Sequence, residues 1–476
     1  MSNLYDAVII GSGFGGSIPA LRLAQNGKKV LVLEQGYRNT ENDFRQSWDP
    51  KYLVKMNQVI PSDDYAVFYR SGMTLGGGSV VFSGLMNRAP SEVFQFVDFR
   101  GYKVWPDAVT RQVMDPYYAM VEQMMSVRQA TWDEVPKTGG TFARMMDTMG
   151  LTCDRANYPY INCRQCGFCE AGCIYGAKQS LMFNYIPQAE GAGVEFRTGC
   201  IAMTILPGPG GYSVQYMDPH SGQTSVQGTV VILAAGAIGS AAILLRSKQY
   251  LSQLSPQVGQ NFNNNGDLIV GFELPDGWPP FYSYKGRTNA GVMTYAFWDE
   301  YRITIHTGSV PPAIFSGLNI HRPGEHAWGP GFKQWTKEIY FSKLIMCVVI
   351  GLVTGEGYVY LNNDYPLVHF SPTTPSFTDY VNKVVAVGSS IAKANNAMLL
   401  QTRTHGYEYT ANHMLGTVRI GDDPALSPAD PYGQVRGYPG LFVADSSSIP
   451  GGTGVNLSLT TAANAERIAA YIVTTW

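Results

Sequence analysis

Four cysteines crowd into one short run of the chain, Cys163, Cys166, Cys169 and Cys173. The spacing Cys-x2-Cys-x2-Cys-x3-Cys is that of bacterial ferredoxins, in which thiolates hold an iron–sulfur cluster. Two observations count against a cluster here, because Ile174 rather than proline follows the run and the chain has no second run. An iron–sulfur cluster and a structural zinc stay open as alternatives. We favour a packed cysteine-rich loop and expect no metal.

Glycines near the N-terminus have the spacing of a phosphate-binding turn. The sequence Gly11-Ser-Gly13-Phe14-Gly-Gly16 follows a short apolar strand at 6–10 and precedes a helical segment at 17–26. A second strand at 29–34 ends in Glu34, whose carboxylate can accept hydrogen bonds from a ribose hydroxyl. Strand, glycine turn, helix, strand and acid in this order predict a dinucleotide site, with the pyrophosphate at the helix N-terminus. The motif alone does not choose between NAD and FAD.

Three further segments favour FAD. The second glycine-dense loop, at 70–79, contributes Gly72, Leu75, Gly76, Gly77 and Ser79. A buried strand at 229–235 runs through Ala235 into Gly236 and a helix at 241–245, and a strand at 440–445 ends in Asp445. Separate segments that converge on one ligand suit an elongated cofactor better than a nicotinamide held by one βαβ unit. The alternative is that these are ordinary glycine turns of a large α/β protein.

The stretch 451–460 places one polar side chain, Asn456, at the start of the last expected helix, 457–473. A helix N-terminus carries partial positive charge and unpaired N–H groups, so it favours a group that becomes anionic beside it. The sequence therefore predicts a site for developing negative charge at this point.

Bulk properties exclude several classes. With 476 residues the chain predicts two domains or one two-lobed unit, and a formal charge of −2 without a basic run argues against nucleic acid. The longest apolar run, Leu344–Val353, is too short to span a membrane and predicts a buried strand. No secretory signal is visible, and the crowded cysteines do not form a disulfide framework, so we expect a cytoplasmic protein.

Together these motifs resemble the glucose–methanol–choline (GMC) family of FAD oxidoreductases. The resemblance includes Leu75–Ser79, Gly236–Ile238, the run His413–Pro424, Leu441–Pro450 and Gly454-Val455-Asn456 through Arg467. Gly-Val-Asn is similar to the cholesterol-oxidase-like branch, which pairs a histidine with an asparagine. Many members also share Cys166–Ser180 and are not regarded as iron–sulfur proteins.

The chain departs from the family at two neighbouring positions. Phe82 replaces the asparagine that usually follows the Leu-Gly-Gly motif. Val81 stands where choline-oxidase-like members carry the histidine that bonds covalently to flavin, so the resemblance implies a non-covalent flavin.

The resemblance implies an α/β fold with a discontinuous Rossmann-like FAD-binding domain and a substrate lobe built on a mixed sheet. The first would comprise 1–90, 160–250 and 405–476, and the second 91–159 and 251–404. A strand from Gly193 to Ile201 would pass the adenine, which makes Ile201 a cofactor contact. Within the lobe we expect a hairpin at 357–370 and a long helix at 378–398.

The implied chemistry is oxidation of the CH–OH group of an alcohol, with hydride transfer to flavin N5. By resemblance, His413 is the base or hydrogen-bond partner, Asn456 orients the substrate oxygen, and the helix after it faces the flavin N1–C2=O edge. His405 is expected to be structural. The other histidines carry no signal in the sequence: His220, His306, His321, His326 and His369.

Aromatic residues between 251 and 400 favour a bulky, largely apolar alcohol over a small polar one. The electron acceptor, oxygen or another compound, and hence oxidase or dehydrogenase, is not decided by any residue. Two other functions stay open, an atypical family member such as a lyase and a flavin or iron–sulfur electron-transfer subunit.

Overall fold

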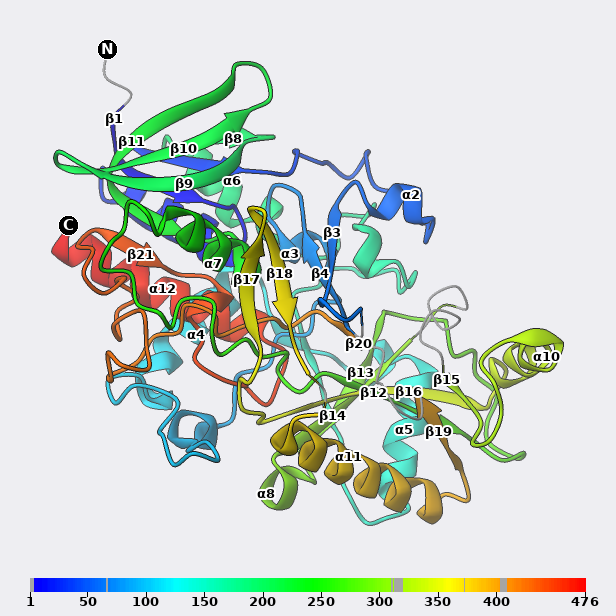
Figure 1. The fold of residues 1–476 in the computed structure, drawn as a ribbon. Coiled ribbons are helices and arrows are strands. Elements are labelled where there is room, and N and C mark those ends of the chain that lie inside the picture. The colour runs from blue at the N-terminus through cyan, green and yellow to red at the C-terminus, as the bar shows by residue number, and fades with distance from the viewer. Residues whose placement is uncertain (1–3, 66, 310, 312–319, 372, 403–408) are drawn as a thin grey trace.

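The computed structural model describes residues 4–476 except 66, 310, 312–319, 372 and 403–408. Within these residues the protein is a mixed α/β structure whose strands form two seven-stranded sheets and three smaller ones. One large sheet lies at the end of the molecule that holds both termini, and the other lies at the opposite end (Figure 1).

The first sheet has the order β8-β2-β1-β11-β10-β9, with β21 paired to β11. Its strands are β1 (Leu4–Ile10), β2 (Val30–Glu34), β8 (Glu195–Thr198), β9 (Ile201–Gly208), β10 (Gly211–Asp218), β11 (Gly222–Leu233) and β21 (Leu441–Val443). The strands β8, β2, β1, β11 and β21 are parallel, and Val8 pairs with Leu31 on one side and Val231 on the other. All three side chains are fully buried, as expected for a parallel sheet covered on both faces.

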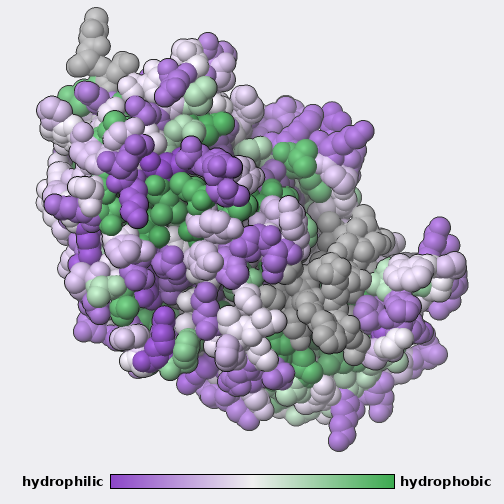
Figure 2. Space-filling view, in the orientation of Figure 1, coloured by the Kyte–Doolittle hydropathy of each residue, from purple (hydrophilic) through white to green (hydrophobic). Residues whose placement is uncertain are grey.

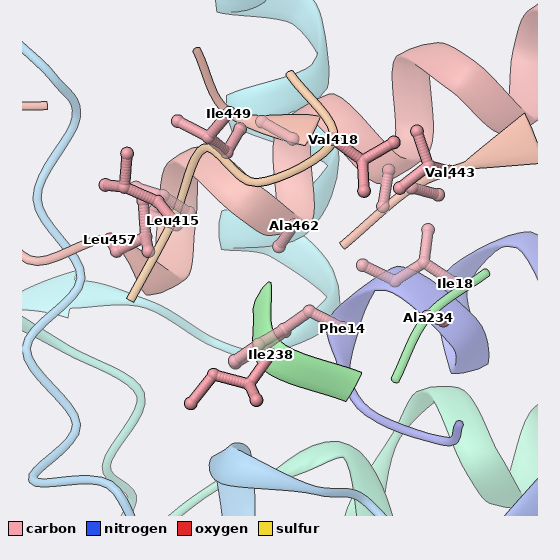
Figure 3. Close-up of a cluster of buried hydrophobic side chains, with 14 of the residues drawn as sticks. Phe14, Ile18, Ala234, Ile238, Leu415, Val418, Val443, Ile449, Leu457 and Ala462 are labelled. Atoms are coloured by element: carbon pink, nitrogen blue, oxygen red, sulfur yellow. The ribbon is translucent and has the colours of Figure 1, made fainter. Parts of the chain in front are cut away.

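Two helices pack together beside this sheet, α1 (Phe14–Gln25) and α12 (Ser458–Thr475). Arg22 of α1 makes a bidentate pair with the buried Glu466 of α12, with both N–O distances 2.7 Å. Figure 3 shows part of the shared core, where Ile18 of α1, Ala462 of α12 and Val443 of β21 gather. This packing fixes the two helix N-termini relative to each other.

The second sheet has the order β15-β19-β12-β16-β14-β13-β6. Its strands are β6 (Asp154–Arg155), β12 (Leu268–Glu273), β13 (Asn289–Thr294), β14 (Ile303–Gly308), β15 (Ile320–His321), β16 (Leu344–Gly351) and β19 (Met398–Thr402), all paired antiparallel. Successive side chains of a strand point to opposite faces. Val270, Ile305 and Val349 face the apolar side of α11 (Pro375–Ala394). Ile269, Val348 and His306, which pair across the strands, therefore share the other face.

The remaining elements connect or cover these two sheets. The other strands are β3 (Asn57–Pro61), β4 (Val67–Gly72), β5 (Arg128–Gln129), β7 (Asn157–Tyr158), β17 (Tyr358–Asn362), β18 (Tyr365–His369) and β20 (Tyr409–Ala411). The other helices of four or more residues in the described ranges are α2 (Pro50–Leu53), α3 (Gly78–Val81), α4 (Arg111–Met124), α5 (Lys137–Asp147), α6 (Tyr185–Gly191), α7 (Gly236–Ser247), α8 (Trp298–Tyr301) and α10 (Gly329–Ile339), with the 3-10 turn η1 (Ser91–Gln95).

Most expected elements are confirmed, with shifted ends. The hairpin is β17–β18, and the long helix, α11, begins and ends earlier than expected. The single strand expected from Gly193 to Ile201 is wrong, because β8 ends at Thr198 and β9 begins at Ile201. Gly199, with φ +73°, makes the turn between them and donates its N–H to the Gly36 carbonyl.

The split of the chain into an FAD-binding domain and a substrate lobe stays a prediction. In the ranges that the structure describes, no helix is long and apolar enough to cross a membrane.

Candidate active site

A cavity of about 660 Å³ is lined by residues from both large sheets. Gly11 and Gly13 come from the turn after β1 and Phe14 begins α1, while Val348 lies in β16 of the second sheet and Asp267 directly precedes its strand β12. In the space-filling view, hydrophobic side chains gather over α7, next to β17–β18, with polar side chains around them (Figure 2). Ile243 of α7 and Tyr365 of β18 also line the cavity.

The turn after β1 presents backbone rather than side chains to the cavity. Gly11 has φ +100°, and a Cβ there would lie 2.2 Å from the Ala234 carbonyl oxygen, so only glycine fits. The first turn of α1 has no side-chain cap at Gly13. Its free N–H groups and the positive end of the helix dipole make an anion site at the cavity wall.

Glu34 lies at the cavity wall and is almost fully buried. Its carboxylate accepts hydrogen bonds from the Ser12 N–H (2.9 Å), the Ser12 hydroxyl (2.6 Å) and the Gly36 N–H (2.7 Å). Burial raises the pKa of this carboxyl, and the three donors oppose that rise. Since a carboxylate has about four acceptor sites, one remains for a ligand hydroxyl.

The second glycine loop meets the first. Gly76 donates its N–H to the Ser12 hydroxyl (2.9 Å), and a Cβ on Gly77 would lie 2.9 Å from the Gly13 Cα. Gly72 and Gly77 line the cavity, whereas Leu75, Gly76 and Ser79 lie behind the lining. The Ser79 hydroxyl donates to the Gly76 carbonyl (2.7 Å), which holds the loop in place.

Asp445 joins the segments after β11 and β21. Its carboxylate accepts from the Gly236 N–H (2.8 Å), the Ser240 hydroxyl (2.5 Å) and both the N–H and the hydroxyl of Ser447. Burial raises the pKa of this carboxyl, against these donors. Asp445 thus fixes the turn at Gly236, and it lines the cavity itself. Of the remaining predicted contacts, Ala235, Gly236 and Ile201 also line the cavity, and Gly16 and Val455 do not.

Three polar side chains contact one another in a row at the cavity wall. The Nδ1 of His413 lies 2.6 Å from Asp267 Oδ1, and the Nδ2 of Asn456 lies 3.2 Å from His413 Nε2. All three residues line the cavity. Because Asp267 accepts the Nδ1 proton, Nε2 of neutral His413 carries a lone pair and can accept a proton. The Oδ1 of Asn456 is buried and has no partner within the described residues.

The segment 261–267 holds His413 and Asn456 in register. Asn263 exchanges two backbone hydrogen bonds with Leu415, and Asn265 donates to the Val455 carbonyl (2.8 Å) while its Oδ1 accepts the Thr453 N–H (2.8 Å). The turn before Asn456 is equally tight. Gly454 has φ +67°, and a Cβ there would lie 2.3 Å from the Trp298 ring.

Sequence reasoning missed Asp267, Asn289 and His306, which line the same cavity. The unusual run Asn263-Asn-Asn-Gly-Asp267 directly before an apolar strand is a signal that could have pointed to Asp267. His306 lies in the apolar strand β14 and gives no local signal. His405 lies outside the described residues.

Comparisons with known proteins agree with this geometry. Residues 5–265 match the N-terminal and 375–465 the C-terminal model of GMC oxidoreductases. The chain belongs to the GMC oxidoreductase family.

Two curated relatives act on alcohols by name. A cholesterol oxidase of Mycobacterium tuberculosis is 26% identical over 98% of this chain and 90% of its own. A long-chain-alcohol oxidase of Arabidopsis thaliana is 22% identical over 98% of this chain and 67% of its own. Among solved structures, the formate oxidase of Aspergillus oryzae RIB40, a protein described with modified FAD, has a TM-score of 0.73 at 14% identity and covers 99% of this chain and 98% of that one. The protein is an FAD-dependent oxidoreductase.

The cavity wall fits the FAD of a GMC oxidoreductase. A Cβ on Gly13, Gly78 or Gly236 would meet no protein atom within 4 Å, so side chains there would take space from the cavity. The α1 N-terminus suits the pyrophosphate, and the free acceptor site of Glu34 suits a ribose hydroxyl.

The departures from the family pattern also lie at the cavity. Val81 and Phe82 line it, and the Phe82 ring packs edge-on against Phe14 with centroids 6.0 Å apart. Buried Lys178 donates to the carbonyls of Phe82 (2.9 Å), Val80 (2.7 Å) and Cys169 (2.5 Å). Lys178 therefore ties this segment to the cysteine loop.

The cysteine loop is packed unevenly. Cys169 is buried, Cys166 is exposed, and Cys163 and Cys173 are partly buried. The described ranges contain no group of three or more His, Cys, Asp or Glu side chains arranged to hold a metal ion. Besides the Lys178 bond to the Cys169 carbonyl, the Tyr52 hydroxyl donates to the Ala171 carbonyl (2.6 Å) and Arg70 pairs with Glu170.

Proposed function

We propose that the protein oxidises the CH–OH group of an alcohol, with His413 as the base that takes the hydroxyl proton. The observation that carries this proposal is the chain Asp267–His413–Asn456 at the wall of the cavity. Bound FAD supplies the two-electron acceptor for the hydride of the carbinol carbon.

Asp267 sets the tautomer of the base. Its carboxylate accepts the Nδ1 proton of His413 and also the Asn412 N–H at 3.3 Å, so the imidazole cannot turn freely. The lone pair on Nε2 then faces the substrate hydroxyl, and Asp267 stabilises the imidazolium that forms when the proton arrives.

Asn456 orients the oxygen. Its contact with His413 Nε2 is long at 3.2 Å, and a substrate hydroxyl that donates to Nε2 replaces it. The freed amide N–H then donates to the substrate oxygen. This exchange gives the hydroxyl one acceptor and one donor without moving the backbone.

The N-terminus of α12 stabilises negative charge. Asn456, Leu457 and Ser458 line the cavity, and no side chain caps the first turn of the helix. The positive end of the helix dipole therefore favours the charge that the cofactor gains on reduction.

The substrate is bulky and largely apolar. Next to Asp267 and His413 the cavity wall carries Leu268, Ile269, Val348 and Met414. The names of the two curated relatives, a cholesterol oxidase and a long-chain-alcohol oxidase, support an apolar alcohol. Oxygen or another compound takes the electrons, and a cytoplasmic location stays a prediction.

The decisive experiment is an anaerobic titration of the purified protein with n-octanol, cyclohexanol, cholesterol and glucose, followed by flavin absorbance. We expect at least one of the three apolar alcohols to bleach the flavin. A flavin that dithionite bleaches but no alcohol does would refute alcohol oxidation and favour a non-redox role. Peroxide formed in air with the reactive alcohol would mark an oxidase, and none would mark a dehydrogenase.

A further inference from the structure

A second histidine, His306, lies on the face of the large antiparallel sheet that borders the cavity. It pairs with Val348 of β16, which pairs with Ile269 of β12, and all three residues line the cavity. Asp267 directly precedes β12, two residues before Ile269, and it also lines the cavity. The His306 side chain is 4% exposed. The fold therefore places a buried imidazole on the same wall as the Asp267–His413 pair.

Hydrogen bonds around His306 decide which nitrogen holds its proton. The Oδ1 of Asn289 accepts the Tyr158 hydroxyl (2.6 Å) and the Gly291 N–H (3.3 Å), so the Asn289 amide nitrogen points the other way. That nitrogen lies 2.8 Å from His306 Nδ1 and donates to it. An acceptor Nδ1 carries no proton, and the neutral imidazole must carry its proton on Nε2.

The surroundings keep this imidazole neutral. Burial, and then the nearby charge of His413, lower the pKa of His306 to about 4, although Asp267 and the backbone at Thr307 oppose the shift. At neutral pH, His306 is therefore an uncharged N–H donor and cannot compete with His413 for the substrate proton.

The Nε2–H of His306 has no hydrogen-bond partner among the residues that the structure describes. Within the described residues it is a buried polar atom without a hydrogen bond, as are Asn456 Oδ1 and Thr461 Oγ1, which belong to the same cavity wall. Leaving a buried donor unpaired is unfavourable, because it has given up its hydrogen bond to water without replacing it. Groups of such atoms at one cavity point to a ligand that supplies the missing partner.

We propose that His306 donates its Nε2–H to the reacting oxygen of the substrate, as a contact additional to His413 and Asn456. This inference rests on the proposed alcohol oxidation. As the O–H bond breaks and the proton moves to His413 Nε2, the electron pair stays on the oxygen, which gains negative charge. The C–H electron pair leaves as hydride to bound FAD, and the oxygen becomes that of a carbonyl. A fixed neutral donor stabilises the oxygen throughout.

Ligands should bind differently according to whether their oxygen can donate a hydrogen bond, accept one, or both. An alcohol can donate to His413 and accept from His306. The methyl ether of the same alcohol can only accept, so its binding depends on His306 and not on the base. A hydrocarbon of the same shape uses neither residue.

The experiment compares wild type, His306→Leu and His306→Gln, whose amide keeps an N–H donor, with His321→Gln as a change at a buried histidine outside the cavity. The probe is whichever of n-octanol, cyclohexanol and cholesterol reduces the wild-type flavin fastest. We expect the limiting reduction rate of His306→Leu to fall ~10²-fold with FAD content unchanged, and His306→Gln to recover most of it. The methyl ether of the probe, followed by flavin difference spectra, should bind His306→Leu ~10-fold more weakly and His413→Gln as tightly as wild type.

Normal reduction by His306→Leu, or a His306→Gln variant as slow as His306→Leu, would overturn the inference and leave the proposed function standing. A wild-type flavin that none of the probes reduces would instead overturn the proposed function.

A measurement without substrate tests the tautomer directly. In the holoenzyme with ¹⁵N-labelled histidine, NMR should show one imidazole with its proton on Nε2 that does not titrate above about pH 5 and that is lost in His306→Gln. A proton on Nδ1 of His306, or titration near the ordinary histidine pKa, would contradict the proposal even if His306→Leu failed to fold.

Discussion

The two walls of the cavity differ in what they present to it, backbone on one side and polar side chains on the other. On the side of the parallel sheet, much of the wall is backbone: the glycine turns at 11–15 and 77–78, and the open N-terminus of α1. On the side of the antiparallel sheet, it is polar side chains on separate elements, Asp267, Asn289 and His306, facing His413 and Asn456. A site made of backbone tolerates almost no added atoms, whereas a site made of side chains depends on single polar atoms.

The largest effect on FAD binding is expected at Gly11, where two backbone segments approach each other most closely. In Gly11→Ala the new Cβ would lie 2.2 Å from the Ala234 carbonyl oxygen at φ +100°, so β1 and the strand end at Ala234 must separate. We expect complete loss of bound FAD, measured as flavin per protein after gel filtration. The same change at Gly208, an exposed residue of β9 with no atom within 4 Å of the new Cβ, should keep the flavin. A yellow Gly11→Ala protein would contradict the close approach.

On the other wall, Asp267→Asn removes a charge without changing shape. The neutral amide either turns its N–H toward His413 or no longer stabilises the imidazolium that His413 becomes. We therefore expect flavin reduction to be ~10²-fold slower with FAD still bound. Stopped-flow absorbance under anaerobic conditions measures the rate.

The chain supplies a matched control for that variant. His369 Nδ1 lies 2.9 Å from Asp63 Oδ2, and neither residue lines the cavity. Asp63→Asn breaks a His–Asp contact that is more exposed than the His413–Asp267 pair, and it should leave the rate unchanged. Equal loss in both variants would mean that the effect comes from stability and not from the site.

A smaller effect concerns acid stability. The folded pKa of His306 is about 4, below the value of about 6.5 in the unfolded chain, so the unfolded chain binds an extra proton between these values. His306 therefore contributes its full share to the free energy of unfolding above about pH 6.5. This share is lost as the pH falls toward 4, and the total loss is up to ~3 kcal/mol.

Urea unfolding at about pH 7.5 and about pH 5 should therefore show a smaller drop in midpoint for His306→Leu than for wild type. His321→Gln should keep the wild-type drop. An unchanged drop in His306→Leu would show that His306 is not held neutral by the fold.

The same contrast explains which residues of the site could be predicted from the sequence. The site around Gly11, Glu34, Gly236 and Asp445 was predictable because a backbone site needs glycines and acids at fixed local spacing. The resemblance to GMC oxidoreductases pointed to His413 and Asn456, which lie together at the cavity, and their roles stay predictions. Asp267 and His306 were not, because they reach the cavity only through the pairing of β12 and β14 with β16. A one-residue change in that register would turn His306 toward α11.

The predicted ends of several strands and helices were wrong for a related reason. The expected strand from Gly193 to Ile201 is broken at Gly199, whose backbone bonds to Gly36 of a distant segment. The helices α1 and α7 begin at Phe14 and Gly236, within their glycine turns, and so earlier than the starts at 17 and 241 that the sequence led us to expect. At Gly199, a contact with a distant segment sets the strand end.

The most direct test of the account is the rate of anaerobic flavin reduction by the reactive alcohol in His413→Gln, with His369→Gln as control. If His413 Nε2 takes the hydroxyl proton, His413→Gln keeps its FAD and reduces it ~10²-fold or more slowly, while His369→Gln matches wild type. Wild-type reduction by His413→Gln would contradict the assignment of the base.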